Sequence, residues 1–331
     1  DRNLESYIPR VDSILKLADK LFKEVPNYID IGGGYFGRVD ESLQKQFSTR
    51  VPEYKEYGGE TKIALMDNSS LAFMHELSQR SYPSDGILSV YDLILIPKWV
   101  MEEIEDSTYR STYVEQLQAQ GYPIRWIDET KYGAFVNDED VNLYYIVEAA
   151  VSRVSELMRF LRRKVKTEDL IDLPSAEEWM NRLYDEWPIH GRTLSTGRTL
   201  KKNAGEISLT ILAEIFAWYH DGVDSLTIYT QDTDAHEFQT NAERMLTGKS
   251  EFTPALDSPI SVAFKSNDFI LCQMYREGAL TLDEVRQLRR DDRKLTYTRQ
   301  QADKSIICRK EVITKEQFID LIQDGTVQIL F

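Results

Sequence analysis

The stretch Ile63-Ala64-Leu65-Met66-Asp67-Asn68-Ser69-Ser70 decides the fold class that the sequence predicts. Four consecutive apolar residues, followed at once by Asp and Asn, indicate a buried strand that ends in a carboxylate. Later in the chain, Leu226-Thr227-Ile228-Tyr229-Thr230 repeats this arrangement and runs into Gln231-Asp232-Thr233-Asp234. Because ligands in an open α/β sheet bind beyond the carboxyl ends of the strands, both acidic strand ends are candidate functional positions.

Other short apolar runs alternate with helical patterns along the chain. Strands are predicted at 93–96, 122–128, 260–264 and 327–330, and a loop at 188–202. Helices are predicted at 71–79, 99–105, 138–166, 178–187, 206–219, 269–277, 282–291 and 315–322. Strands that alternate with helices predict a three-layer α/β fold with a mainly parallel sheet. We expect an N-terminal segment and linker over 1–60, a central domain over 61–270 with a mostly helical insertion at about 105–200, and a helical extension over 271–331.

Composition narrows the functional classes. The 331 residues carry a net charge of −15, which argues against binding nucleic acid through a broadly basic surface, although a local basic rim would suffice for a nuclease. The chain contains no run of about 20 apolar residues that would span a membrane. Two cysteines provide neither a disulfide framework nor a zinc site. A cytoplasmic location is therefore the default expectation.

Acidic residues at strand and helix ends form the candidate site. Asp67 and Asp232 follow strands, Glu103 lies on the helix after Pro97, and Glu206 opens a helix. Carboxylates gathered in one place suit Mg²⁺ or Mn²⁺, which can activate water and stabilise phosphoryl displacement. Each acid also has a plain alternative role: Asp67 as a helix cap, Glu103 as a solvated helix residue, and Glu206 as a partner of the helix dipole.

In this order, these blocks resemble the PIN-domain nucleases over about residues 61–270. The resemblance rests on the strand ending at Asp67, on Val100-Met101-Glu102-Glu103-Ile104, on Gly205-Glu206-Ile207-Ser208-Leu209, and on Thr230-Gln231-Asp232-Thr233-Asp234. It implies a PIN-like fold in which Asp67, Glu103, Glu206 and Asp232 are catalytic and Asp234 is an outer metal ligand. About 100 residues separate Glu103 from Glu206, far more than in compact members of the family, which leaves the size of the substrate open.

The resemblance implies a Mg²⁺- or Mn²⁺-dependent endoribonuclease of single-stranded RNA, with a toxin, defence or RNA-processing role. A regulatory, antitoxin-like protein partner follows from the same analogy, and the oligomeric state, including a homo-oligomer, stays open. Candidate substrate-binding residues are Arg192, Arg198, Lys201 and Lys202, which lie in the basic segment before Glu206. The alternative from another class is a non-catalytic α/β interaction module with a degenerate PIN-like fold.

A second, shorter resemblance concerns the N-terminal segment. Ile29-Asp30-Ile31-Gly32-Gly33-Gly34-Tyr35-Phe36-Gly37, after a helical pattern, resembles the phosphate-binding segment of the alanine racemase-like PLP barrels over about residues 4–58. The Schiff-base lysine of that family lies upstream of this segment, outside the chain, and a whole barrel needs about 250 residues. A structural helix and loop, a barrel remnant, and a PLP-enzyme fragment fused to an accessory domain are the three interpretations of this segment.

Overall fold

The stretch around Asp67 forms the middle of a five-stranded parallel sheet in the computed structural model, which describes residues 51–331 except 83–84, 105–107, 167–172 and 194–198. The glycine-rich N-terminal segment lies outside the described residues. The strands follow the order β3-β2-β1-β6-β7. They are β1 (Lys62–Met66), β2 (Leu93–Pro97), β3 (Ile124–Ile127), β6 (Ser225–Tyr229) and β7 (Val262–Lys265). Leu65 pairs with Leu95 on one side and with Ile228 on the other, so β1 is buried between two parallel neighbours.

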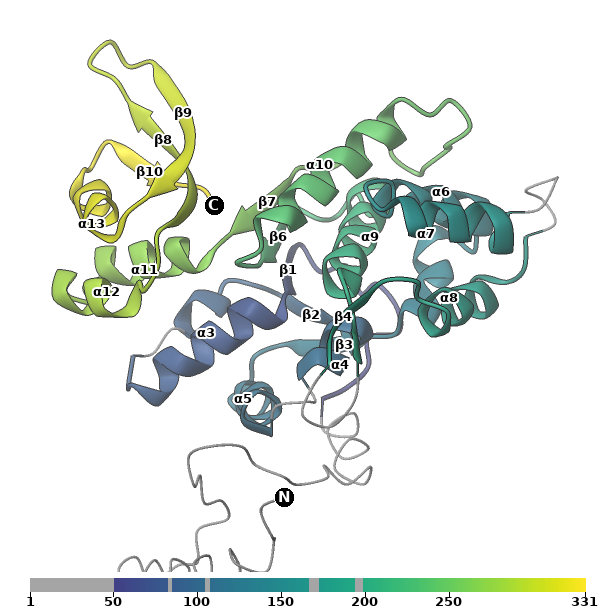
Figure 1. Ribbon diagram of the computed structural model, residues 1–331, viewed down its shortest axis with the longest axis horizontal. Helices are drawn as coiled ribbons and strands as arrows, with labels where there is room; N and C mark the ends of the chain where they lie inside the picture. Colours follow the sequence, from purple (N-terminus) through teal and green to yellow (C-terminus); the bar gives the residue numbers. More distant parts are fainter. Residues whose placement is uncertain (1–50, 83–84, 105–107, 167–172, 194–198) are drawn as a thin grey trace, which may run out of the picture.

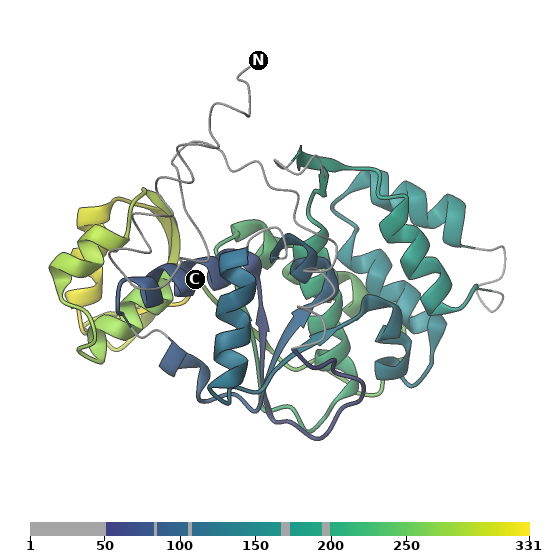
Figure 2. The same ribbon diagram turned by 90° about the horizontal axis from the view of Figure 1, so that it is seen from below.

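Helices cover both faces of this sheet and make three layers (Figure 2). The helices next to the sheet are α3 (Asn68–Gln79), α4 (Lys98–Ile104), α5 (Thr108–Ala119), α9 (Ala204–Tyr219), α10 (Thr233–Thr247) and α11 (Asn267–Arg276), and a short 3-10 turn, η2, spans Asp85–Leu88. The apolar helix α9 packs over β1, β2 and β6, while α3 and α5 lie against each other on the other side. The predicted α/β class with a parallel central sheet is confirmed.

The segment between β3 and α9 forms additional helices and a short strand pair. Its elements are η3 (Glu129–Val136), α6 (Asp140–Ala150), α7 (Ser155–Phe160), the π-helix η4 (Leu161–Val165), α8 (Ala176–Asp185), β4 (His190–Thr193) and β5 (Thr199–Lys201). Of these, η3 and α6 pack against α9. The single long helix predicted at 138–166 is wrong, because the chain turns between Ala150 and Ser155. There the Ser152 hydroxyl donates to the Ala149 carbonyl, a local bond that competes with the helix. The predicted loop at 188–202 contains the antiparallel pair β4–β5.

The C-terminal unit contains a second sheet that the sequence pattern did not predict (Figure 1). Helix α12 (Leu282–Leu288) is followed by β8 (Arg293–Gln300), β9 (Ile306–Ile313), α13 (Lys315–Gln323) and β10 (Val327–Ile329), with the antiparallel order β10-β8-β9. The predicted helices and the edge strand are present, but the description of 271–331 as a helical extension is wrong. Capping boxes start α12 at Thr281 and α13 at Thr314.

The described end of the predicted linker belongs to the core. Val51 is 1% exposed and Tyr54 is 5% exposed. The Tyr54 N–H donates to the Trp126 carbonyl (2.7 Å), and the Trp126 N–H donates to the Pro52 carbonyl (3.1 Å). These bonds add the chain beside β3, so the folded unit begins before residue 61. In the described part of the chain, no helix has both the length and the apolar character needed to cross a membrane.

Candidate functional site

The candidate site lies where the direction of strand succession changes in the sheet. From β1 the chain adds β2 and β3 on one side, and it later adds β6 and β7 on the other. In open parallel sheets such a switch point opens a crevice beyond the carboxyl ends of the two central strands. Asp67 directly follows β1 and Asp232 comes three residues after β6, so both carboxylates belong to this edge.

Asp67 is held by three hydrogen bonds and is 6% exposed. Its Oδ1 accepts the Asn68 N–H (2.7 Å), and its Oδ2 accepts the hydroxyls of Ser69 (2.6 Å) and Thr230 (2.8 Å). Burial raises the pKa of Asp67, the three hydrogen bonds oppose this increase, and the charge of Asp232 adds to it. Asp67 thus caps α3, and its carboxylate is held in one orientation while burial and the charge of Asp232 disfavour its ionised form.

The ends of β1 and β6 are tied together by the same residues. The Ser69 hydroxyl accepts the Gln231 N–H (3.0 Å), and the Thr230 hydroxyl accepts the Asp232 N–H (3.0 Å). Thr230 therefore lies between Asp67 and the backbone of Asp232. This network fixes the relative position of the two strand ends to which the acids are attached.

Glu103 and Asp67 converge on the first turn of α9. A Cβ atom added at Gly205 would lie 3.4 Å from Glu103 Oε1 and 3.9 Å from Asp67 Oδ1. Asn68 Nδ2 also donates to Glu103 Oε2 (3.3 Å). Gly205 is therefore required for close approach, since a side chain there would press on Val100 at 3.3 Å and on the Glu103 carboxylate.

Glu206 completes the cluster. Burial raises its pKa to about 9, with further contributions from the charges of Asp67, Asp232 and Glu103. Without a cation, this carboxyl group is protonated at neutral pH. Four acids predicted from the sequence are thus close enough to act on one another, although they are separated by up to 165 residues in the chain.

Asp232 and Asp234 differ in position. Asp232 caps α10, and its Oδ1 accepts the Asp234 N–H (2.8 Å). The Asp234 side chain is exposed in the first turn of α10, and its hydrogen bond to the cluster comes from the backbone. The proposed outer-ligand role of Asp234 therefore has less structural support than the roles of the other four acids.

The chemistry of the cluster fits a hard divalent cation, because all its donors are carboxylate oxygens and their mutual repulsion would be relieved by a positive charge. Among the residues that the structure describes, however, no group of three or more His, Cys, Asp or Glu side chains is arranged so that it could hold a metal ion. A cation could be bound there only if some of these side chains rotated. Glu103 and Glu206 are the long, partly exposed members of the cluster and have the rotatable bonds for it.

Of the four predicted substrate-binding residues, the structure describes the side chains of Lys201 and Lys202. Arg198 lies outside the described residues, and Arg192 is placed only as part of the β4 backbone. Lys201 Nζ donates to the Tyr184 carbonyl and lies 3.2 Å from the centroid of the Tyr184 ring, so it is directed at α8. Lys202 is exposed and lies four residues before Glu206 in the chain.

Arg110 is a basic residue that the sequence analysis missed. Its Nη1 donates to Asn68 Oδ1, and Asn68 in turn bonds to Glu103. Through Asn68, which bonds to both Asp67 and Glu103, the Arg110 guanidinium can orient these two acids, and it can also contact a phosphate. The sequence around Arg110 contains no motif that marks it as a site residue, because only the tertiary packing of α5 brings it to the acids. Ser69 and Thr230, by contrast, directly flank the acidic motifs in the sequence.

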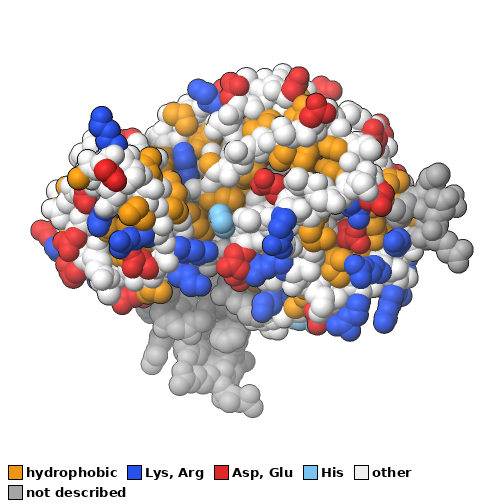
Figure 3. Space-filling model, turned by 90° about the horizontal axis from the view of Figure 1, so that it is seen from above, with side chains coloured by type: hydrophobic (Ala, Val, Ile, Leu, Met, Phe, Trp, Pro, Cys, Tyr) orange, Lys and Arg blue, Asp and Glu red, His pale blue; other side chains and the backbone are white. Residues whose placement is uncertain are grey.

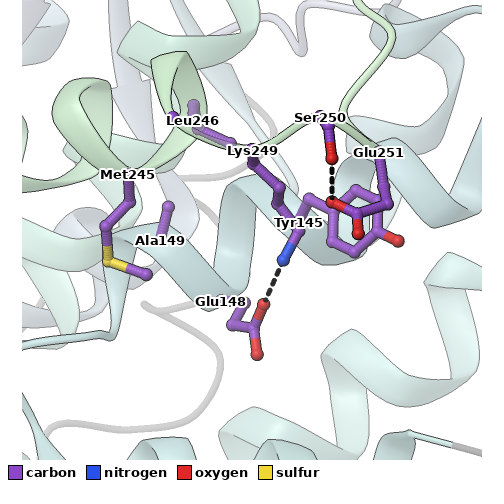
Figure 4. Close-up of a pocket in the computed structure, with 9 residues that line it drawn as sticks. Tyr145, Glu148, Ala149, Met245, Leu246, Lys249, Ser250 and Glu251 are labelled. Carbon is purple, nitrogen blue, oxygen red and sulfur yellow. Dashed lines mark hydrogen bonds and ion pairs between the residues drawn. The ribbon is translucent and has the colours of Figure 1, made fainter.

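A pocket of about 200 Å³ lies away from the acids, at the opposite end of α10. Its lining includes Tyr145, Glu148 and Lys249, and Lys249 Nζ forms an ion pair with Glu148 (3.1 Å; Figure 4). Asp232 caps the start of α10, whereas this pocket adjoins the residues after its end, a separation of about 22 Å along the helix. The pocket therefore does not belong to the carboxylate cluster.

No protein-family model, curated protein or solved structure matches this chain.

Proposed function

We propose that this protein is a divalent-metal-dependent endoribonuclease with a PIN-like fold that hydrolyses phosphodiester bonds of single-stranded RNA. The observation that carries the proposal is the convergence of Asp67, Glu103, Glu206 and Asp232 at the switch point of a parallel sheet. A cluster of like charges in a partly buried place is unfavourable by itself, and it is explained if a cation is bound there during function.

Asp67, Glu206 and Asp232 are the residues that would hold Mg²⁺ or Mn²⁺, with Asp234 as an outer ligand. A bound ion of this kind supplies an activated water and stabilises the charge that develops on the phosphate. The chain's own residues orient the acids: Ser69 and Thr230 fix the Asp67 carboxylate, and Asn68 holds Glu103. Arg110, which bonds to Asn68 beside the acids, would contact the phosphodiester backbone, and Lys202 is a further candidate for this role. A toxin, defence or RNA-processing role, with a regulatory protein partner, follows from the family analogy.

A non-catalytic α/β interaction module is the second candidate. The observation that favours it is that, among the described residues, no acidic group stands in an arrangement that could hold a metal ion. In such a module Asp67 and Asp232 would serve only as the helix caps that they also are. The two candidates therefore differ in whether the acids are needed for a chemical activity.

The test is cleavage of end-labelled single-stranded RNA and DNA of the same sequence with Mg²⁺, Mn²⁺ or EDTA. Wild type and Asp232→Asn are compared with Asp221→Asn, an exposed acid before β6 at the opposite edge of the sheet. We expect metal-dependent cleavage of RNA by wild type and by Asp221→Asn, and a loss of at least 100-fold in Asp232→Asn. Absence of cleavage by the wild type under all conditions would favour the interaction module.

A further inference from the structure

The C-terminal sheet contains an extended basic ribbon, defined here as β8 and β9 with their connection, residues 293–313. This ribbon carries six Lys and Arg and two acidic residues, a net charge of +4 in a chain whose total is −15. Such a concentration of positive charge on one element of an acidic protein would attract a polyanion to that element. Figure 3 shows Lys and Arg side chains over the C-terminal unit and along its border with the rest of the molecule.

The two faces of the ribbon differ in character. One face buries Leu295, Tyr297 and Ile313. Side chains alternate along a strand, and the register pairs Lys294 with Val312 and Thr296 with Lys310, so both lysines belong to the other face. That face is solvent-accessible and also carries the exposed Val312 (60%).

The lysine face of the ribbon borders the start of α10. Lys310 Nζ lies 4.0 Å from Glu237 Oε1, and Lys294 also acts electrostatically on Glu237. Glu237 is five residues after Asp232, which caps the same helix, so the rise along the helix between them is about 7.5 Å. Because Arg153 also pairs with Glu237 (2.6 Å), this group of charges has a net positive sign.

Aromatic and ionic contacts hold the ribbon in this position. Phe331, after β10, stacks on His236 of α10 (ring centroids 6.1 Å apart) and contacts Phe264 of β7 (5.6 Å). At the base of the ribbon, Arg293 bonds to Asp268, which is 1% exposed and follows β7. The lysines are thus presented from a fixed element, at the same edge of the sheet as the acids.

We propose that the lysine face of the basic ribbon, through Lys294 and Lys310, binds the phosphodiester backbone of single-stranded nucleic acid and directs the strand toward the carboxylate cluster. This inference rests on the proposed nuclease function. Lys310 pairs with Glu237, which lies about 7.5 Å beyond Asp232 along α10, so a strand bound by the lysine face needs to extend by only a few nucleotides to reach the acids. The acids repel a polyanion, so a cationic element outside the cluster would add to the hold that Arg110 provides on the strand.

The experiment measures binding without cleavage, by fluorescence anisotropy of labelled 12-nucleotide RNA and DNA in EDTA. Wild type is compared with the double variant Lys294→Gln/Lys310→Gln. The matched control is Lys55→Gln/Lys131→Gln, which removes two exposed lysines elsewhere. Each phosphate contact on a single strand contributes about 0.7 to the salt slope, so we expect the slope to fall by about 1.4 and affinity at 0.1 M salt to fall by on the order of 20-fold. The control should bind like the wild type.

Several results would overturn the inference. These are equal binding by the wild type and the ribbon variant, no binding of either nucleic acid by the wild type, or a wild-type dimer in sedimentation that the ribbon substitutions dissociate. The last result would assign the face to a second copy of the chain.

Cleavage measured separately with Mn²⁺ distinguishes this inference from the proposed function. If the enzyme is active and the variant binds like the wild type, only the binding role of the ribbon is refuted. If binding depends on the ribbon but no cleavage occurs, only the nuclease function is refuted.

Discussion

Replacement of Glu206 by Gln should make the metal-free protein markedly less sensitive to alkaline pH. The pKa of Glu206 is raised from 4.5 to about 9, first by burial and then by the charges of Asp67 and the other acids. The native state therefore keeps a proton that the unfolded chain has lost. Because the native state binds more protons, stability falls as pH rises. This favourable contribution is complete below pH 4.5 and is lost progressively up to about pH 9.

The expected change in unfolding free energy follows from the single proton that Glu206 keeps in the native state. Each pH unit between the two pKa values costs about 1.4 kcal/mol, so the wild type should lose on the order of 3 kcal/mol of unfolding free energy between pH 5.5 and 7.5 through Glu206. Glu206→Gln cannot lose that proton and should show a correspondingly flatter dependence. Addition of Mg²⁺ at pH 7.5 should stabilise the wild type more than the variant, because a cation favours the ionised cluster.

Urea unfolding in EDTA at several pH values between 5.5 and 7.5 measures this difference. The matched control is Glu178→Gln, which changes an exposed Glu in the first turn of another helix, α8. The control should follow the pH dependence of the wild type. Identical pH dependence of wild type and Glu206→Gln would refute the conclusion that this carboxyl group is buried among like charges.

Three further substitutions test separate parts of the structure. Gly205→Ala places a Cβ 3.4 Å from Glu103 Oε1 and should cost about 1–3 kcal/mol of stability and most of the metal-dependent cleavage, measured by unfolding and by RNA turnover. Thr230→Val removes a hydroxyl that donates to Asp67, so the pKa of Asp67 should rise further and the acidic limb of the pH–rate profile should move to higher pH. Asp268→Asn leaves two arginines without their carboxylate in a buried place and should destabilise the protein by about 3–5 kcal/mol in urea unfolding.

Each of these substitutions has a control of the same type. Gly86→Ala adds a Cβ with no heavy atom within 4 Å, Thr240→Val changes a hydroxyl on the exposed side of α10, and Asp283→Asn changes an exposed acid. Full activity of Gly205→Ala would show that the first turn of α9 does not crowd the acids. An unchanged pH profile in Thr230→Val, or a stability loss in Asp268→Asn no larger than in Asp283→Asn, would contradict the corresponding contact.

The sequence predicted the central sheet because its strands are buried on both faces. Continuous apolar runs such as 63–66 and 93–96 are typical of parallel strands covered by helices, and they indicate both the element and its surroundings. The same criterion missed β8 and β9, since β9 is exposed along nearly its whole length and contains Arg309 and Lys310. A strand that is exposed along most of its length has a charged sequence, which a local pattern does not distinguish from a loop.

The acids at the site were predictable because strand ends and helix starts fix where they emerge. Asp67 and Asp232 follow apolar strands directly, so their edge of the sheet follows from the strand direction. The contact between Gly205 and Glu103, and the position of Arg110 beside Asn68, depend on how α4, α5 and α9 pack. Such long-range packing leaves no trace in local periodicity.

Calorimetric titration of Mn²⁺ into the protein at pH 7.5 tests whether Asp67 and its neighbours form a divalent-metal site. We expect saturable binding to the wild type, a loss of affinity of at least tenfold in Asp67→Asn, and unchanged binding in Asp221→Asn. Mn²⁺ binding of equal affinity in Asp67→Asn and the wild type, or no binding by the wild type, would contradict the presence of this site.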